Sequence, residues 1–332
     1  SARQRRTTCQ PMPAMTWRSP AKNRPGLFTP PTVMVPPSMP VFSTSRRAMR
    51  VPPTSLARVT NPARTPPCHG TTTTSPTFGG ASWLAFGTLE SGVWLPNQLR
   101  YGYLVASRVP PLASYFEKAG YRTVSVMPGT TMPWPEGRYF GYRKAYQARD
   151  LAYRGPAFGF APMPDQFVLD RIRRIEILPA QDPLFIRYVL VSTHAPFHRQ
   201  PRFVPDWERI GDGSLYHQIP AIEFPNNWPD LTEAFGAYLT AIDTELTVIG
   251  DYLTRFDHGD ALIIILGDHQ PNAHITGPEA PSLVPVHVIS RHAASLEPFR
   301  QMGFVQGVVP PDTPPFGSMQ EFLPAFLAGF SR

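Results

Sequence analysis

No aspartate or glutamate precedes Glu90 in this chain of 332 residues. Residues 1–75 nevertheless hold 14 of the 42 prolines and 11 of the 31 Lys and Arg residues. A Pro/Thr/Ser/Arg-rich segment without apolar periodicity cannot bury enough surface to fold. We therefore expect residues 1–75 to be disordered and residues 76–332 to form the folded domain.

The basic excess of the chain belongs to this N-terminal segment. Residues 76–332 carry 20 Lys and Arg against 24 Asp and Glu, although the whole chain has a formal charge of +7. The segment is either a basic arm for nucleic acid or anionic lipid, or a stretch without a partner. Its charges are scattered and form no patch, which favours the second interpretation, so we expect no nucleic-acid partner.

A change of reading frame is a further hypothesis for residues 1–75. A shifted frame in GC-rich DNA would produce a sequence of biased amino-acid composition, such as "VPPTSLARVT". The sequence with regular apolar patterns begins near Ser75. The segment would then be a frameshifted copy of a different native sequence.

Cysteine and long apolar runs are both scarce. Cys9 and Cys68 lie in the N-terminal segment, so the folded part has no disulfide framework, cysteine metal site or cysteine nucleophile. Apolar runs such as "ALIIIL" (261–266) are far shorter than the roughly 20 residues of a membrane span. No secretory signal is visible, and the chain as written is expected to be soluble.

Helices alternate with strands from residue 112 onward. A helix that begins near Leu112 stops at Gly120 and leads to a strand at 121–127. A helix at 165–178 leads to an apolar strand at 184–192, and an amphipathic helix around 235–253 leads to "ALIIIL". This alternation predicts an α/β fold with a mostly parallel sheet covered by helices on both faces.

Polar residues follow two of these strands. His194 lies in "STHAPF" after the strand at 184–192, and Asp268 and His269 lie in "GDHQP" after "ALIIIL". Such sheets bind ligands beyond the carboxyl ends of their strands. Carboxylate and imidazole suit a divalent cation such as Zn²⁺, Mn²⁺ or Mg²⁺. The alternative is a turn-capping aspartate beside a partly buried histidine.

The order of these motifs resembles the sulfatase and alkaline phosphatase superfamily. The resemblance covers about residues 75–330 and includes "SPTFGGASWLAFGTLESG", "YFEKAGYRTVSV", "STHAPF" and "GDHQP". It is strongest to the membrane-anchored branch, the lipoteichoic-acid-synthase-like and phosphoethanolamine-transferase-like enzymes. The resemblance implies that Asp268 and His269 ligate one divalent metal ion and that His194 contacts the substrate.

The position of the nucleophile is inferred from its distance along the sequence to a helical motif of the family. Sulfatases place it nine residues before a helical Thr-Gly, and here Ser82 stands nine residues before Ser91 and Gly92. The flanking "FGG" permits close approach of an anion, and a hydroxyl at a helix start lies near the positive end of the dipole. Thr77 is the second choice. The alternative for Ser82 is a helix cap without chemistry.

The context of Ser82 favours phosphate esters over sulfate esters. Sulfatases use a formylglycine made in a Cys-x-Pro-x-Arg context, and "SWLAF" has neither the proline nor the arginine. An unmodified hydroxyl suits transfer or hydrolysis through a covalent serine intermediate. The expected substrate is an anionic phospholipid or a phosphorylated or sulfated small molecule or glycan.

Two features of the family are not found. Its first strand supplies an acidic metal ligand upstream of the nucleophile, where this chain has no acid, so the domain is expected to lack that strand. Its transmembrane helices are not visible either, although the family implies a cell-membrane location with an extracytoplasmic catalytic domain. The alternative function is therefore a catalytically inactive, truncated or frameshifted remnant.

Two further residues are candidates for substrate binding. His287, in "VPVHVIS", lies on what is expected to be the next strand, where a structural histidine is the alternative. Arg138 lies in the aromatic segment 128–163, where its guanidinium could pair with a phosphate or form a structural ion pair.

Overall fold

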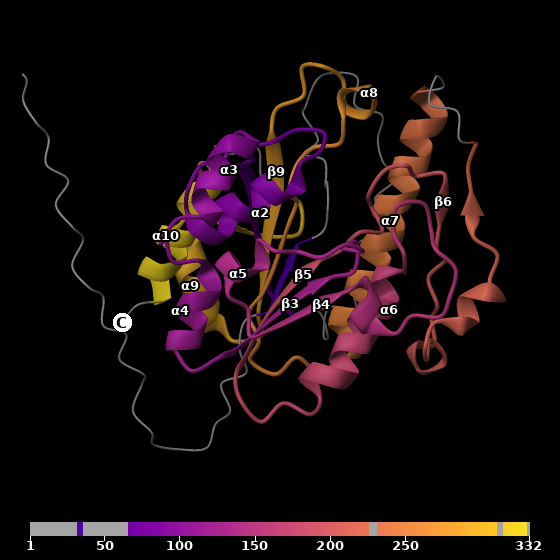
Figure 1. Ribbon diagram of the computed structural model, residues 1–332, viewed down its shortest axis with the longest axis horizontal. Helices are drawn as coiled ribbons and strands as arrows, with labels where there is room; N and C mark the ends of the chain where they lie inside the picture. Colours follow the sequence, from indigo (N-terminus) through magenta and orange to yellow (C-terminus); the bar gives the residue numbers. More distant parts are fainter. Residues whose placement is uncertain (1–31, 36–65, 226–230, 311–314, 331–332) are drawn as a thin grey trace, which may run out of the picture.

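The computed structural model describes residues 32–35, 66–225, 231–310 and 315–330, which form an α/β fold (Figure 1). Its main sheet has eight strands, in the spatial order β10 (Val305–Gln306), β2 (Cys68–Thr74), β9 (Leu283–Ile289), β8 (Ile263–Leu266), β1 (Thr32–Val35), β5 (Leu184–Val189), β3 (Arg122–Met127) and β4 (Lys144–Gln147). A separate pair consists of β6 (Arg199–Gln200) and β7 (Ile222–Glu223).

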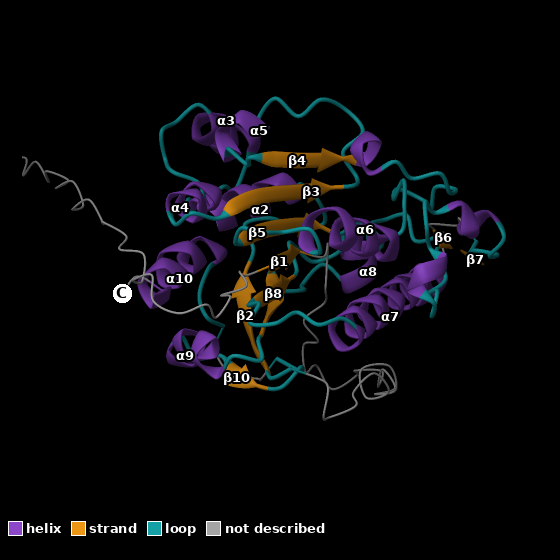
Figure 2. Cartoon of the chain, turned by 90° about the horizontal axis from the view of Figure 1, so that it is seen from below, coloured by secondary structure: helices purple, strands orange, loops and turns teal. Residues whose placement is uncertain are grey.

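Helices cover both faces of the main sheet (Figure 2). They are α2 (Ser82–Ser91), α3 (Gln98–Val105), α4 (Leu112–Lys118), α5 (Gly137–Phe140), α6 (Asp165–Ile172), α7 (Leu231–Arg255), α8 (Ala273–Thr276), α9 (Ala293–Gln301) and α10 (Phe322–Phe330). A π-helical turn, Arg173–Ile177, continues α6, and 3₁₀ turns lie at Ala148–Leu151, Trp207–Arg209, Ser214–His217 and Met319–Glu321. Within the described ranges, no helix has both the length and the apolarity needed to cross a membrane.

The sheet is mixed, so the expectation of a mostly parallel sheet needs correction. Strands β4, β3, β5, β1 and β8 are parallel neighbours, whereas β9 pairs antiparallel with both β8 and β2, and β10 pairs antiparallel with β2. A parallel return needs a long crossover, usually a helix. The connection from β8 to β9 contains only the one-turn helix α8, and the two strands are antiparallel.

Two strands of the sheet come from the N-terminal segment that we expected to lie outside it. β2 pairs along its whole length with β9, and β1 lies between β5 and β8. Threonine has high β-propensity, so the threonine run of β2 favours a strand. The Pro/Thr/Ser/Arg-rich composition of the whole segment had favoured disorder instead. The expected boundary at residue 75 therefore differs from the structure; the rest of the proposed disordered segment, 1–31 and 36–65, lies outside the described residues.

Strand β8 illustrates why the sheet is buried on both sides. Ile263 and Ile265 pack into the core beneath α6 and α7, whereas Ile264 and Leu266 pack into the core beneath α2, α4, α9 and α10. Successive side chains of a strand point to opposite faces, so a strand covered on both faces must be apolar throughout. The uninterrupted apolar run predicted this arrangement.

A buried ion pair joins α2 to the middle of the sheet. Arg187 on β5 donates to Glu90 on α2 (2.7 Å) and to Ser125 on β3 (2.6 Å), and the Tyr142 hydroxyl also donates to Glu90 (2.7 Å). Arg187 is 3% exposed and Glu90 is 1% exposed. Burial raises the pKa of Glu90, while Arg187 and Tyr142 oppose that shift. The contacts of this pair offset part of the cost of burying both charges.

Replacing Glu90 with glutamine should destabilise the protein strongly. The change leaves Arg187 charged and buried without a counter-charge, which costs about 3 kcal/mol of unfolding free energy. Urea unfolding followed by circular dichroism measures the loss. The matched control is Glu297→Gln, because Glu297 pairs with Arg300 at the surface (3.0 Å) and such pairs contribute little. Equal effects of the two substitutions would contradict the prediction.

Two further buried carboxyl groups belong to helices α6 and α7. Asp165 on α6 is 1% exposed and Glu245 on α7 is 3% exposed. Burial raises the pKa of Asp165 to about 7, against the hydrogen bonds from Ser192 and Val191. Burial also raises the pKa of Glu245 well above its ordinary value, and the charge of Asp165 adds to this shift. Both groups therefore bind protons more tightly in the folded protein than in the unfolded chain.

The raised pKa values of these two groups predict that Glu245→Gln changes the free energy of unfolding in a pH-dependent way. The stability contributed by the two carboxyl groups is fully present below their ordinary pKa of about 4 and is lost as the pH rises through the folded-state values. Glutamine stays neutral, so the variant should gain stability over the native protein as the pH rises from about 5 to about 8. Urea unfolding across this range is the measurement. A difference that does not change with pH would show the prediction to be wrong.

Candidate active site

Ser82 is the first helical residue of α2 and follows a loop with unusual backbone angles. The loop places Gly79, Gly80 and Ala81 at φ angles of 70°, 151° and 59°. An alanine in the left-handed region costs about 1 kcal/mol, and such strain is frequent at functional sites. Ala81 occupies the capping position and no side chain caps the helix, so the alternative interpretation of Ser82 as a cap is wrong.

Two hydrogen bonds hold this loop against the loop that follows β8. The Gly79 amide donates to the Gln270 carbonyl (2.9 Å), and the Ser75 hydroxyl donates to the Asp268 carbonyl (2.5 Å). A Cβ atom at Gly79 would lie 3.1 Å from the Cα atom of Asn272, in addition to the strain of its positive φ. Glycine at this position therefore permits the close approach of the two loops, which carry Ser82 and His269.

Ser82, Asp268 and His269, three residues proposed from the sequence, lie close together in the structure. The Ser82 Oγ lies 3.2 Å from His269 Nε2, and Asp268 Oδ2 lies 3.4 Å from the same nitrogen. His269 Nδ1 lies 2.7 Å from the Gln270 carbonyl, to which it must donate, so Nε2 is the nitrogen with a lone pair toward Ser82. The second-choice residue, Thr77, donates its hydroxyl to the Gly80 carbonyl (2.6 Å) within its own loop.

His194 lies in the turn after β5, close enough to Asp268 and His269 for their charges to act on it. Burial lowers the pKa of His194, the Ala195 carbonyl and Asp268 raise it, and His269 lowers it further. The imidazole is therefore neutral at neutral pH. Its ring stacks on Phe160 with 3.7 Å between centroids, a contact that no sequence pattern had indicated.

The structure does not bring His287 or Arg138 into this group. His287 lies in the middle of β9, where Nε2 donates to the Val308 carbonyl (2.8 Å) and burial lowers its pKa. Arg138 is exposed on the short helix α5, and no ion pair of its side chain occurs among the described residues. Their proposed contacts with substrate remain predictions.

The donor set for a cation is incomplete among the described residues. Asp268 supplies a carboxylate, His269 an imidazole and Ser82 a hydroxyl, which are suitable ligand types. However, no group of three or more His, Cys, Asp or Glu side chains able to hold a metal ion occurs within the described ranges. Taken alone, the described residues do not fit the closed ligand set of a tightly bound ion.

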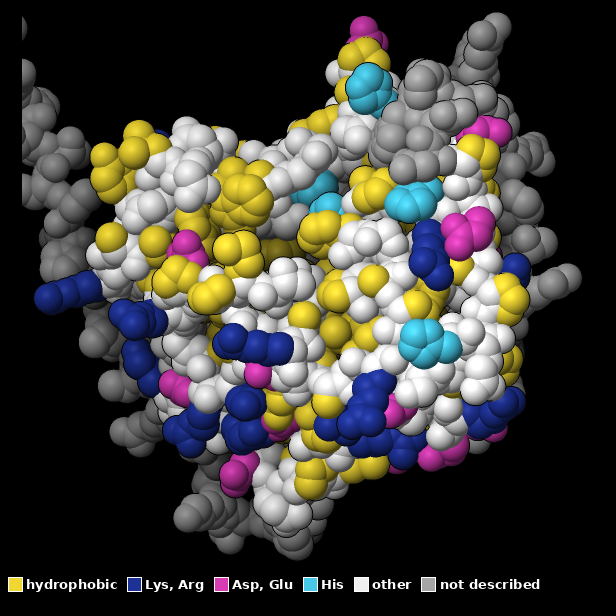
Figure 3. Space-filling view, turned by 45° about the vertical axis from the view of Figure 1, so that its right-hand side comes forward, with side chains coloured by type: hydrophobic (Ala, Val, Ile, Leu, Met, Phe, Trp, Pro, Cys, Tyr) yellow, Lys and Arg dark blue, Asp and Glu magenta, His cyan; other side chains and the backbone are white. Residues whose placement is uncertain are grey.

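Hydrophobic side chains surround a hollow that contains histidine side chains (Figure 3). Trp83, next to Ser82, is 48% exposed, and its indole N–H donates to Gln98 on α3 (2.8 Å). Phe160, whose ring stacks on His194, is also 48% exposed. Exposed aromatic side chains thus occur in contact with His194 and next to Ser82 in the sequence.

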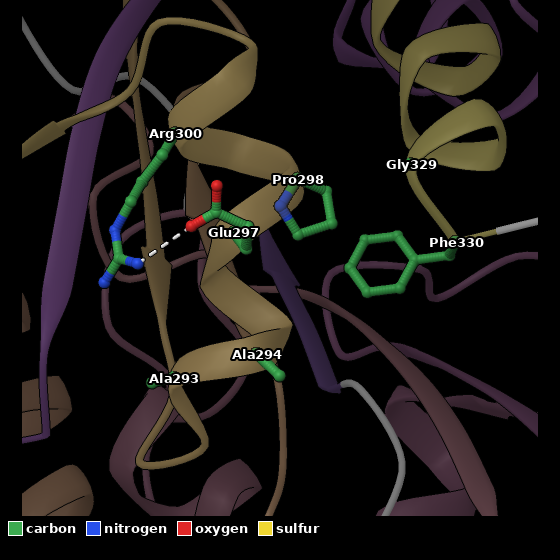
Figure 4. A pocket seen from close by; sticks show the side chains of 7 residues that line it. All are labelled: Ala293, Ala294, Glu297, Pro298, Arg300, Gly329 and Phe330. Atoms are coloured by element: carbon green, nitrogen blue, oxygen red, sulfur yellow. Dashed lines mark hydrogen bonds and ion pairs between the residues drawn. The ribbon is translucent and has the colours of Figure 1, made fainter.

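A separate groove of about 520 Å³ lies between α9 and the end of α10. Figure 4 shows Glu297 and Arg300 paired along α9, with Pro298 facing Phe330 of α10. None of the predicted site residues lines this groove. The candidate active site is therefore the group at the ends of β5 and β8 together with the start of α2.

A family model described as sulfatase matches residues 69–287, and the chain belongs to the sulfatase family. Comparison with curated proteins gives no match. The match to the family runs from within β2 to within β9 and includes Ser82, His194, Asp268 and His269.

Similar solved structures share the fold at low sequence identity. The C-terminal periplasmic domain of EptC from Escherichia coli has a TM-score of 0.56 and 17% identity, covering 91% of this chain and 82% of that one. The corresponding domain of the phosphoethanolamine transferase EptC from Campylobacter jejuni has a TM-score of 0.54 and 12% identity, covering 91% and 89%. The lipoteichoic acid synthase LtaP from Listeria monocytogenes has a TM-score of 0.52 and 14% identity; the match covers 78% of this chain and 65% of that one.

Zinc should bind weakly and through Asp268. One carboxylate, one imidazole and one hydroxyl form a smaller set than the four ligands of a structural zinc site. Isothermal calorimetry with Zn²⁺ should show weak binding to the native chain and none to Asp268→Asn. The control is Asp257→Asn, an exposed aspartate paired with Arg291, which should bind as the native chain does. Tight stoichiometric binding that survives Asp268→Asn would contradict this prediction.

Proposed function

We propose that the chain transfers or hydrolyses phosphate esters, with Ser82 as the nucleophile. The observation that carries the proposal is the 3.2 Å distance between the Ser82 hydroxyl and His269 Nε2 at the start of α2. A hydroxyl beside a proton acceptor and a helix start is suited to attack an anionic centre. Thr77 is less suited, because its hydroxyl is engaged with Gly80.

In the first step, Ser82 Oγ attacks phosphorus and its proton passes to His269 Nε2. The bond from phosphorus to the leaving oxygen breaks, and the leaving oxygen takes up a proton from solvent while His269 returns its proton to solvent. In the second step, an acceptor hydroxyl or water attacks the phosphorus of the phosphoserine and passes its proton to His269 Nε2, and the bond from phosphorus to Ser82 Oγ breaks as Oγ takes that proton back. His194 is neutral in this scheme and contacts the substrate through hydrogen bonding, without an added charge.

The proposed substrate is a phosphate ester with an apolar part, such as an anionic phospholipid, or a phosphorylated glycan. Support comes from the aromatic surface at Trp83 and Phe160 and from the similar fold of a phosphoethanolamine transferase. Sulfate esters are disfavoured because "SWLAF" lacks the formylglycine context. By the same likeness we propose an extracytoplasmic location, as in the periplasmic domain of EptC.

Asp268 and His269 are the side chains that we propose to hold a divalent cation. The E. coli domain has been solved as a complex with Zn. A bound cation would supply positive charge that lowers the pKa of the attacking hydroxyl. The steps above describe the chain without the cation, because the described donor set is incomplete. His269 Nε2 has one lone pair, so with a cation bound it would be a ligand and not the proton acceptor.

The second candidate function is an inactive remnant that binds phosphate esters without turnover. The observation in its favour is the same incomplete donor set. Anion binding would then depend on the start of α2 and on His194, and no phosphoserine would form. The experiment below separates the two functions.

Ser82→Ala should abolish both turnover and covalent labelling. The assay is hydrolysis of bis(p-nitrophenyl) phosphate, with and without Mn²⁺ or Zn²⁺, together with mass spectrometry of the quenched protein. The native chain should release one p-nitrophenol and gain a p-nitrophenyl phosphoryl adduct on Ser82, and the matched variant Thr77→Ala should retain this adduct. Loss of a nucleophile typically reduces turnover by about 10⁶-fold. Turnover that survives Ser82→Ala would exclude Ser82, and binding without turnover in the native chain would support the remnant.

A further inference from the structure

Asp165 at the start of α6 binds the backbone of the turn that carries His194. Its Oδ2 atom accepts from the amides of Val191 (2.7 Å) and Ser192 (2.6 Å). The contact is reciprocal, since the Asp165 amide donates to the Ser192 hydroxyl (3.0 Å). Three hydrogen bonds therefore connect one residue of α6 to the first two residues of this turn.

The turn ends at His194. The His194 amide donates to the Val191 carbonyl (3.0 Å), which closes residues 191–194 into one turn. The His194 ring is then held on two sides, by the Ala195 carbonyl at Nδ1 (2.5 Å) and by the Phe160 ring. The direction of the imidazole thus depends on the backbone that Asp165 holds.

Packing alone does not require a carboxylate at this position. Burial penalises the charge of Asp165, and Glu245 lies near enough for the two charges to interact. An apolar residue would avoid this cost. What the Asp165 side chain provides is an oxygen that accepts two amide hydrogens at once. These two hydrogen bonds offset the free-energy cost of burying Asp165, and they fix the geometry of the turn.

We propose that Asp165 is a positioning residue for His194, acting through the amides of Val191 and Ser192. The proposal rests on the proposed function in assigning His194 a contact with substrate. The geometric part, in which Asp165 fixes the turn, stands without that assignment. The two parts are therefore tested by separate measurements.

The geometric test uses the full chain and needs no turnover. Diethyl pyrocarbonate modification of His194 is followed by mass spectrometry, with the exposed His274 on α8 as internal reference. Asp165→Ala should increase the modification rate of His194 severalfold relative to His274, because the turn loses two of its anchors. Asp165→Asn, which keeps an accepting oxygen, should stay near the native rate. Glu297→Gln, a change on α9 outside the turn and the site, should leave the rate unchanged.

The functional test is a double-mutant comparison on the phosphodiester substrate. Asp165→Ala should reduce kcat/KM by about 10- to 100-fold, as expected when a substrate contact is displaced by about 1 Å. In the His194→Ala background, Asp165→Ala should cause little further loss, since the residue that it positions is absent. Ser192→Ala removes one of the three bonds and provides a milder variant if Asp165→Ala does not fold.

Two results would overturn the proposal. The positioning role is refuted if His194 reactivity is unchanged in both Asp165→Ala and Ser192→Ala, or if the activity losses of Asp165→Ala and His194→Ala multiply. A chain without turnover that still shows the reactivity change would refute the proposed function and support the geometric role. Increased reactivity together with non-multiplying losses supports the whole proposal.

Discussion

The buried ion pair between Arg187 and Glu90 fixes the two elements on which the site depends. Glu90 lies near the end of α2, whose first residue is Ser82, and Arg187 lies in the middle of β5, which leads to His194. Neither charge tolerates burial without the other. The pair therefore sets where α2 lies on the sheet, and small movements of a nucleophile relative to its partners affect catalysis strongly.

The other half of the site depends on backbone contacts between loops. Gly79 and Ser75 bind the carbonyls of Gln270 and Asp268, so the loop before α2 and the loop after β8 form one unit. These contacts involve a glycine amide and a serine hydroxyl, which occupy little space and allow close approach. The ion pair positions the helix axis, and the loop contacts position its first turn.

Sequence patterns predicted the elements better than their directions. The apolar run around Ile264 predicted a strand buried on both faces, because side-chain alternation requires it. The same patterns contain no information on the direction of β9 or on the threonine strand β2. At the site, Asp268 and His269 follow from their place after a strand. Asp165 was missed because it binds backbone amides, whose arrangement is set by tertiary structure; an acid at a helix start after Pro164 was the available signal.

Strand β1 shows that completing the sheet and completing a metal site make different demands on the sequence. The gap between β5 and β8 must be filled by a strand whose backbone pairs on both sides, and Thr32–Val35 does so. Backbone pairing is nearly independent of side-chain identity, so a short β-branched run suffices. A metal ligand needs a particular side chain. The family resemblance implies an acidic ligand upstream of the nucleophile, and this chain has no Asp or Glu before Glu90. The sheet can therefore be complete while the donor set depends on residues elsewhere.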